Sequence, residues 1–130
     1  MTAVDTNVLV RIITSDDKAQ AARAAAFLRE QDNAFIAKTV LLELEWVLRG
    51  AYRIGRGEIA SALRGVVEVG NTEIEDETAV LQALRWFETG MDFADALHLA
   101  SVGRGNAFAT FNGRLRRRAR RLKIENVVPL

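Results

Sequence analysis

Short runs of apolar and β-branched residues alternate along the chain with longer segments whose apolar residues recur at a helical period. Residues 2–5 predict a first strand, and residues 6–13 predict a helix directly after it. Further strands are expected at residues 33–37, 72–75, 106–111 and 126–130, and further helices at residues 16–31, 39–52, 58–69, 76–90, 92–105 and 112–123. The alternation predicts an α/β fold with a mainly parallel sheet.

Two of these helices carry clear local signals. Apolar residues of the helix at 39–52 recur at i, i+4, i+7 and i+8 and predict a buried stripe made of Val40, Leu44, Val47 and Leu48. The segment 16–31 is rich in alanine, the strongest helix former. Ser15 or Asp16 is expected to be its N-cap.

Composition limits the class of protein. The chain has 130 residues, of which 49% are hydrophobic, and this favours a single domain over residues 1–130. It has no cysteine, which excludes disulfides, thiolate metal sites and cysteine nucleophiles. No signal peptide is apparent, and no apolar run approaches the roughly 18 residues of a membrane helix. We therefore expect a soluble, cytoplasmic protein with no membrane partner.

Asp5 is an unexpected residue in the apolar opening "MTAVDTNVLV". A folded chain is expected to bury this position, and a buried charge is costly unless it is paired, hydrogen-bonded or bound to a metal. Asp5 is therefore a helix cap, half of an ion pair, or a ligand. In open parallel sheets, ligands bind outside the carboxyl ends of the strands, and Asp5 lies at such an end.

Three further acids lie near strand ends or on an apolar helix face. Glu43 borders the apolar stripe of its helix, and Asp92 and Asp95 share one face of a helix start. Each has an ordinary structural explanation: Glu43 can pair with a basic residue, and Asp92 can be an N-cap with Asp95 in the first turn. If the four acids converge, a hard cation such as Mg²⁺ or Mn²⁺ would relieve their repulsion. The single histidine, His98, excludes a histidine-rich site.

Positive charge is concentrated near the C-terminus. Six arginines lie between residues 114 and 121, and after Asp95 the only acid is Glu125. The segment has a narrow apolar stripe, so it is either a solvated helix face or a surface that binds phosphate groups. We favour phosphate binding and expect Arg114, Arg116 and Arg117 to contact a phosphate backbone.

Four sequence stretches occur in an order and at a spacing that point to a known family. They are "AVDTNVLVRIIT", "LLELEWVLR", "MDFADALHLA" and "AFATFNGRL". Together they resemble the PIN-domain ribonucleases, and specifically the VapC toxins of type II toxin–antitoxin systems. The resemblance covers essentially the whole chain, and it is the ordered set rather than any one motif that is specific.

The resemblance implies a three-layer α/β/α sandwich with a central, mainly parallel sheet of four to five strands. It also implies Mg²⁺- or Mn²⁺-dependent cleavage of RNA, with one or two ions per active site. Catalytic and metal-binding roles would fall to Asp5, Glu43, Asp92 and Asp95, with Thr6 and Asn7 as the polar pair beside the first acid. The implied partners are an RNA substrate (tRNA, rRNA or mRNA), a cognate VapB-type antitoxin and a second copy of the chain in a homodimer.

One position departs from the family pattern. Many relatives carry an aspartate where this chain has Asn112, which keeps an oxygen ligand but lacks the charge. Asn112 and Thr110 are therefore expected to be auxiliary polar residues, or Asn112 merely caps the last helix. With one charge fewer, we expect a resting state with one metal ion and a second ion that arrives with the substrate phosphates.

Two other functions fit the same residues. Asn112 is compatible with a catalytically weak PIN module that binds RNA or a protein without cutting. A phosphatase with an aspartyl nucleophile would also place an acid after the first strand. Such enzymes commonly have a second aspartate two residues later, where this chain has Asn7.

Overall fold

A computed structural model describes all residues 1–130. The chain forms two compact units, Met1–Glu77 and Thr78–Leu130. All strand pairs are parallel, and strands and helices alternate, so the expected α/β class is confirmed. No helix has the length and apolar character that crossing a membrane requires.

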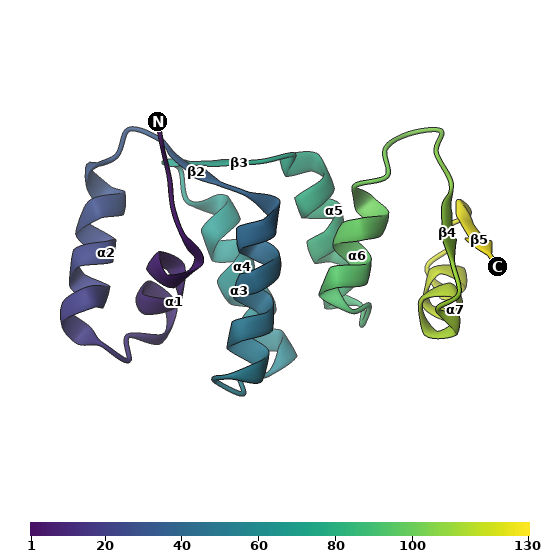
Figure 1. Cartoon of the computed structure of the whole chain (residues 1–130), viewed down its shortest axis with the longest axis horizontal. Coiled ribbons are helices and arrows are strands. Elements are labelled where there is room, and N and C mark those ends of the chain that lie inside the picture. The colour runs from purple at the N-terminus through teal and green to yellow at the C-terminus, as the bar shows by residue number, and fades with distance from the viewer. The chain divides into compact units, whose positions relative to one another are not determined.

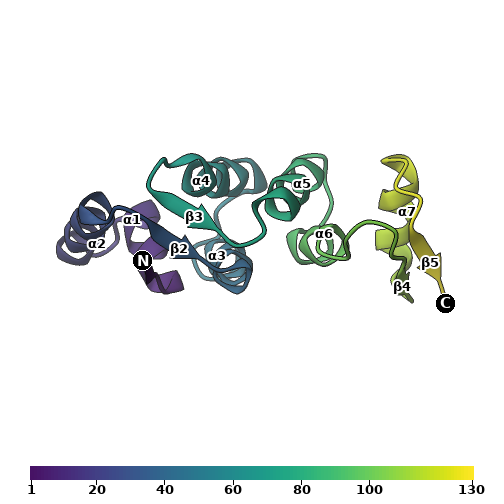
Figure 2. The same ribbon diagram turned by 90° about the horizontal axis from the view of Figure 1, so that it is seen from above.

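The first unit is built on a sheet of three parallel strands in the order β1–β2–β3. Helices α3 and α4 lie side by side, and α1 lies beside α2 (Figure 1; Figure 2). Its elements in chain order are β1 (Thr2–Ala3), α1 (Thr6–Thr14), α2 (Lys18–Glu30), β2 (Ala34–Ile36), α3 (Lys38–Gly50), α4 (Arg56–Glu68) and β3 (Thr72–Ile74).

The core of this unit lies between the sheet and its helices. Strand β2 occupies the middle of the sheet, and its Ala34 and Ile36 are fully buried. The helices contribute a set of aliphatic residues with almost no exposed surface, namely Leu9, Val10, Leu41, Leu44, Leu48, Ile59 and Leu63. This apolar burial is the main contribution to the stability of the unit.

The buried face of α3 differs from the predicted stripe. Leu44 and Leu48 are buried as expected, but Val40 and Val47 are only half-buried. Leu41 and Glu45 take their places in the interior. The helix is therefore rotated by about one residue from the predicted orientation, because Leu41 packs more apolar surface into the core than Val40 would.

The start of α2 was also predicted at the wrong residue. The N-cap is Asp17, whose Oδ1 accepts a hydrogen bond of 3.0 Å from the backbone N–H of Gln20. Ser15 instead ends α1 in a left-handed conformation with φ 52°. Asp16 is not a cap, because its carboxylate contacts Arg11, Thr14 and Tyr52.

The second unit contains a two-stranded parallel sheet of β4 and β5, with α7 beside β5 (Figure 1). Phe87 and Phe93 meet edge to face in its core, with ring centroids 5.4 Å apart. Its elements are α5 (Glu77–Glu88), α6 (Phe93–Ala100), β4 (Phe108–Thr110), α7 (Gly113–Arg121) and β5 (Val127–Pro129).

The turn between α5 and α6 is in contact with α7. Gly90 adopts φ 111°, a conformation that favours glycine. The guanidinium group of Arg118 packs against Gly90 and donates a hydrogen bond of 3.3 Å to the carbonyl oxygen of Thr89. A Cβ atom at position 90 would lie only 3.1 Å from this guanidinium group. Arg118 therefore has a structural role that the sequence pattern did not indicate.

Candidate active site

Asp5 follows β1 and caps α1. Its Oδ1 accepts a hydrogen bond of 2.7 Å from the backbone N–H of Thr6. The side chain is exposed, so the expectation that folding buries Asp5 is wrong. Strand β1 is only two residues long, and the chain leaves the sheet before Asp5 reaches the interior. The capping interpretation is confirmed, and an exposed carboxylate is also available to a ligand.

Thr6 connects this cap to α3. The residue is 3% exposed, and its hydroxyl group donates a hydrogen bond of 2.5 Å to Glu43 Oε1. Glu43 is exposed on α3, which packs against α1. The two carboxylates of Asp5 and Glu43 are thus both hydrogen-bonded to Thr6, one to its backbone and one to its side chain. This contact makes Thr6 a positioning residue for Glu43.

The buried acid of α3 is Glu45 rather than Glu43. Glu45 is 3% exposed, and its Oε2 accepts a bond of 2.8 Å from Arg49 Nε. The alternative role considered for Glu43, an ion pair with a basic residue, is therefore filled by Glu45. The spacing of four residues between Glu45 and Arg49 could have revealed this pair from the sequence.

Asn7 lies on a different side of α1. It lines a pocket of about 440 Å³ between α1 and α2, together with Arg11 and Phe27. It has no hydrogen bond to Asp5 or Glu43, although all three belong to the same unit. The structure thus places Thr6 in contact with Asp5 and Glu43, and Asn7 at the pocket between α1 and α2.

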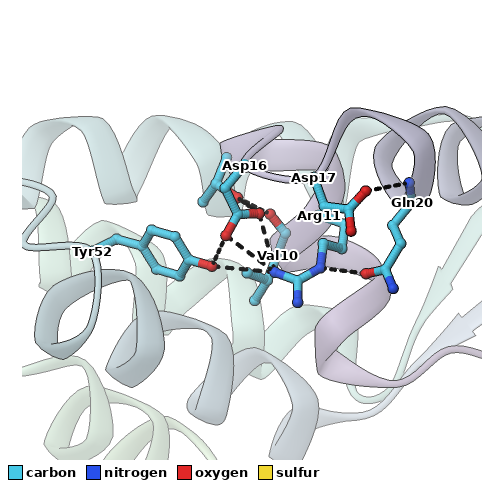
Figure 3. A network of polar contacts seen from close by, with 7 residues as sticks. Val10, Arg11, Asp16, Asp17, Gln20 and Tyr52 are labelled. Atoms are coloured by element: carbon cyan, nitrogen blue, oxygen red, sulfur yellow. Dashed lines mark hydrogen bonds and ion pairs between the residues drawn. The ribbon is translucent and has the colours of Figure 1, made fainter.

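A polar network holds the α1–α2 connection beside this pocket (Figure 3). Arg11 donates to both oxygens of Asp16 and to Gln20 Oε1, the last at 2.6 Å. Tyr52 donates a hydrogen bond of 2.6 Å to Asp16 Oδ2. The hydrogen bond from Tyr52, and to a smaller extent the one from Thr14, holds the pKa of the Asp16 carboxyl below its usual value.

Asp92 and Asp95 lie together at the start of α6. Asp92 is the N-cap, and its Oδ2 accepts a bond of 3.1 Å from the backbone N–H of Asp95. Burial raises the pKa of Asp95, the charge of Asp92 raises it further, and His98 lowers it. A cation bound beside Asp95 would offset the repulsion that raises the pKa of this carboxyl.

Asn112 joins this pair to α7. Its Oδ1 accepts a bond of 3.1 Å from the backbone N–H of Leu115, which confirms the capping interpretation. Its Nδ2 donates a bond of 3.4 Å to Asp95 Oδ2. Thr110 supports the turn, because its hydroxyl oxygen accepts a bond of 2.9 Å from the backbone N–H of Asn112. Thr110 and Asn112 therefore belong to the same cluster as Asp95.

Two acids that follow β3, Glu75 and Asp76, hold the start of α3. The N-cap position of α3 is Ala37, which has no capping side chain. Glu75 takes the role of the missing capping side chain, because its Oε1 accepts a hydrogen bond of 2.8 Å from the backbone N–H of Lys38. Asp76 adds an ion pair of 3.1 Å with Lys38 Nζ. The loop after β3 is thus structurally tied to the helix that carries Glu43.

The arginines of α7 differ in their surroundings. Arg114 and Arg117 are exposed, whereas Arg116 is half-buried and its Nε atom has no hydrogen-bond partner. Leu115 and Ala119 face the interior, as the narrow apolar stripe predicted. The role of Arg114, Arg116 and Arg117 in binding RNA stays a prediction.

The donor groups suit a divalent metal ion of the magnesium or manganese type. All four candidate acids offer carboxylate oxygens, which hard cations prefer, and Asn112 adds an amide. Neither unit by itself brings three carboxylate or histidine side chains together. Instead the first unit holds Asp5 with Glu43, and the second holds Asp92 with Asp95. Each pair on its own would leave most of a cation's ligand shell to water.

Comparison with known proteins gives one family. A family model described as "PIN domain" matches residues 2–121. Neither curated proteins nor solved structures yield a match to the chain. The matched range contains both carboxylate pairs, Asn112 and all of α7.

Proposed function

This chain belongs to the PIN-domain family, and from that premise we propose that it is a Mg²⁺- or Mn²⁺-dependent endoribonuclease. PIN domains are generally nucleases that use divalent metal ions, which indicates a nuclease-type function and an interaction with nucleic acid. The specific reaction proposed is hydrolysis of phosphodiester bonds of RNA. The proposal also treats residues 1–130 as one functional domain.

The observation that carries the proposal is the pairing of the acids at helix starts within the matched range. Asp5 and Asp92 each cap a helix, and each lies next to a second acid. All four carboxylates accept hydrogen bonds: Asp5 and Glu43 from Thr6, Asp92 from the backbone N–H of Asp95, and Asp95 from Asn112. Acids used only for solubility do not need such restraint.

Asp5, Glu43, Asp92 and Asp95 are the residues that would hold the ion. When bound, the ion supplies Lewis acidity that activates water and stabilises the charge that develops on the phosphate. Thr6 keeps Glu43 oriented, and Asn112 does the same for Asp95 while adding no charge. Arg114, Arg116 and Arg117 position the RNA backbone, which affects affinity but not sequence preference.

The biological role that we propose is that of a VapC-type toxin. In this role a VapB-type antitoxin inhibits the nuclease, and its C-terminal segment occupies the active-site groove with an arginine among the acids. A cation facing a group of carboxylates is electrostatically reasonable. The chain would act as a homodimer. The gene next to its own is the first place to look for the antitoxin.

The test is cleavage of a panel of structured RNAs by the purified chain with Mn²⁺. Asp5→Asn and Asp95→Asn are expected to lose at least about 100-fold in rate, because each removes one charged ligand. Asp32→Asn is the matched control, since Asp32 is exposed and forms no ion pair. If Asp5→Asn and Asp95→Asn both cleave at the unmodified rate, the assignment is wrong.

Asn112 favours a second candidate function, a PIN module that binds RNA or protein and cuts poorly. The amide in place of an acid lowers the charge available to a second ion. Retained RNA binding without metal-dependent cleavage by the unmodified chain would favour this function.

A further inference from the structure

Arg116 has a buried donor that no group in the protein satisfies. Its Nε atom is inaccessible to solvent and makes no hydrogen bond. Nearly all buried polar groups in folded proteins are hydrogen-bonded, because an unsatisfied donor costs its full desolvation. A donor left without a partner in the free protein is suited to an acceptor that arrives with a ligand.

This side chain lines a small pocket between α7 and β5. The pocket measures about 150 Å³, and its lining consists of two arginines and four apolar residues, namely Arg116, Arg120, Ala119, Ile124, Val127 and Pro129. Since Arg116 and Arg120 are four residues apart on α7, they lie on the same helix face. The apolar walls reduce the local dielectric constant and strengthen any charge interaction in the pocket.

The charge of the pocket is uncompensated. Neither Arg116 nor Arg120 forms an ion pair with an acid of the chain. Glu125 is the only acid after Asp95, and it forms no ion pair. Guanidinium groups offer donors in a planar fork and no acceptor, so the ligand must be an anion with several oxygen atoms.

We infer that the pocket between α7 and β5 binds a phosphodiester group of an RNA strand through Arg116 and Arg120. The pocket has a volume of about 150 Å³, enough for a phosphate group, and it opens to solvent, so the rest of the strand can continue outside it. Arginine forms bidentate hydrogen bonds to phosphate oxygens, and its positive charge favours the charged phosphodiester over a neutral nucleobase. The inference rests on the proposed function, because the pocket would bind the RNA substrate at a second point besides the carboxylates.

The position of the pocket connects it to the candidate active site. Asn112 begins α7 and contacts Asp95, and Arg116 follows four residues later. At 1.5 Å per residue, Arg116 lies about 6 Å further along the helix axis than Asn112. A strand that passes along α7 from this pocket therefore leads toward Asp95.

The test measures binding of a fluorescein-labelled, single-stranded RNA of mixed sequence to the full chain in EDTA, across a range of NaCl concentrations. Loss of one phosphate contact lowers the slope of log K against log [salt] by about 0.7 for a single strand. Arg116→Gln and Arg120→Gln are each expected to lower the slope by this amount. Arg121→Gln is the matched control, because it makes the same charge change on α7 outside the pocket.

A second arm identifies phosphate as the recognised group. Inorganic phosphate should weaken RNA binding by the unmodified chain more than chloride does at equal ionic strength. The double variant Arg116→Gln/Arg120→Gln should show no such difference. Melting temperatures confirm folding, and Arg120→Gln keeps the test valid if Arg116→Gln is unstable, because Arg120 is exposed.

Three results would overturn the inference. One is an equal loss of binding in Arg121→Gln and Arg116→Gln, which would indicate general charge attraction. Another is unchanged binding in both pocket variants. The third is binding of an acidic peptide, but not of RNA, that depends on Arg116. Cleavage is scored separately with Mn²⁺: RNA binding through Arg116 without any cleavage would contradict the proposed nuclease and support this pocket.

Discussion

The hydroxyl group of Thr6 and the carboxylate of Glu43 are hydrogen-bonded at 2.5 Å, although 37 residues separate them in the chain. Thr6 is buried and cannot move far, whereas Glu43 is exposed and has three side-chain torsions to fix. The bond therefore restrains the acid more than the threonine. It gives an exposed carboxylate on α3 a defined position beside the start of α1.

Replacing Thr6 by valine should impair activity without unfolding the protein. Valine keeps the shape of threonine but removes the donor to Glu43, and loss of a group that orients a metal ligand typically costs 10–100-fold in metal affinity or activity. We expect a loss of this size in Mn²⁺-dependent cleavage. Thr39→Val is the control, because Thr39 is exposed on α3. An equal effect of both variants would contradict the positioning role.

Glu43 and Glu45 should respond oppositely to the same substitution. Glu45→Gln weakens the bond to Arg49 inside the core and is expected to lower the free energy of unfolding by about 1–3 kcal/mol. Glu43→Gln should leave stability within about 0.5 kcal/mol, since the side chain is exposed, but should abolish cleavage. Urea denaturation and an RNA cleavage assay on both variants measure the two effects. Loss of stability in Glu43→Gln alone would reverse the assignment.

Substitution of Asn112 should separate helix capping from metal binding. Asn112→Ala removes the cap of α7 and should cost about 1 kcal/mol of stability. Asn112→Asp keeps a cap and adds a charge near the helix N-terminus, so stability should be maintained. Isothermal titration with Mn²⁺ should show tighter binding to Asn112→Asp than to the unmodified chain. Weaker binding would mean that the amide contact with Asp95 contributes more than the added charge.

The network at Arg11 predicts a dependence of stability on pH. Folding lowers the pKa of Asp16, chiefly through the hydrogen bond from Tyr52. The stabilisation is therefore present above the unfolded pKa of about 3.9 and is lost as the pH falls through the folded pKa. Tyr52→Phe should lower the melting temperature at pH 7 more than at pH 2.5.

A double-mutant cycle isolates this effect. In an Asp16→Asn background the carboxylate is absent at every pH, so the effect of Tyr52→Phe should no longer vary with pH. If the variation persists in that background, Asp16 is not the titrating group.

The order and type of the elements could be predicted from sequence because apolar runs and helical periods are local properties. Every expected strand and helix is present. Boundaries were less predictable. The helix at 92–105 ends at Ala100, because Gly103 and Gly105 adopt positive φ angles that end regular structure. The rotation of α3 depends on what packs against it, which a periodic pattern does not specify.

The helix caps of the candidate site could be predicted from the sequence, whereas its long-range contacts could not. Asp5 and Asp92 directly precede helices, and that position alone suggests capping. The bond between Thr6 and Glu43 joins segments with no pattern in common. The contact of Arg118 with Thr89 could not be predicted, because the sequence does not distinguish this arginine from the five others of the segment.

The link between Lys38 and the loop after β3 has a consequence for how the first unit assembles. Helix α3 begins at a residue without a capping side chain, and its first-turn donor is satisfied by Glu75. The start of α3 is therefore stabilised by a residue that directly follows the pairing of β3 with β2. Glu43 lies in the second turn of that helix, so its position also depends on this non-local contact. Pairing of β3 with β2 and the placement of Glu43 on α3 are thus coupled through Lys38.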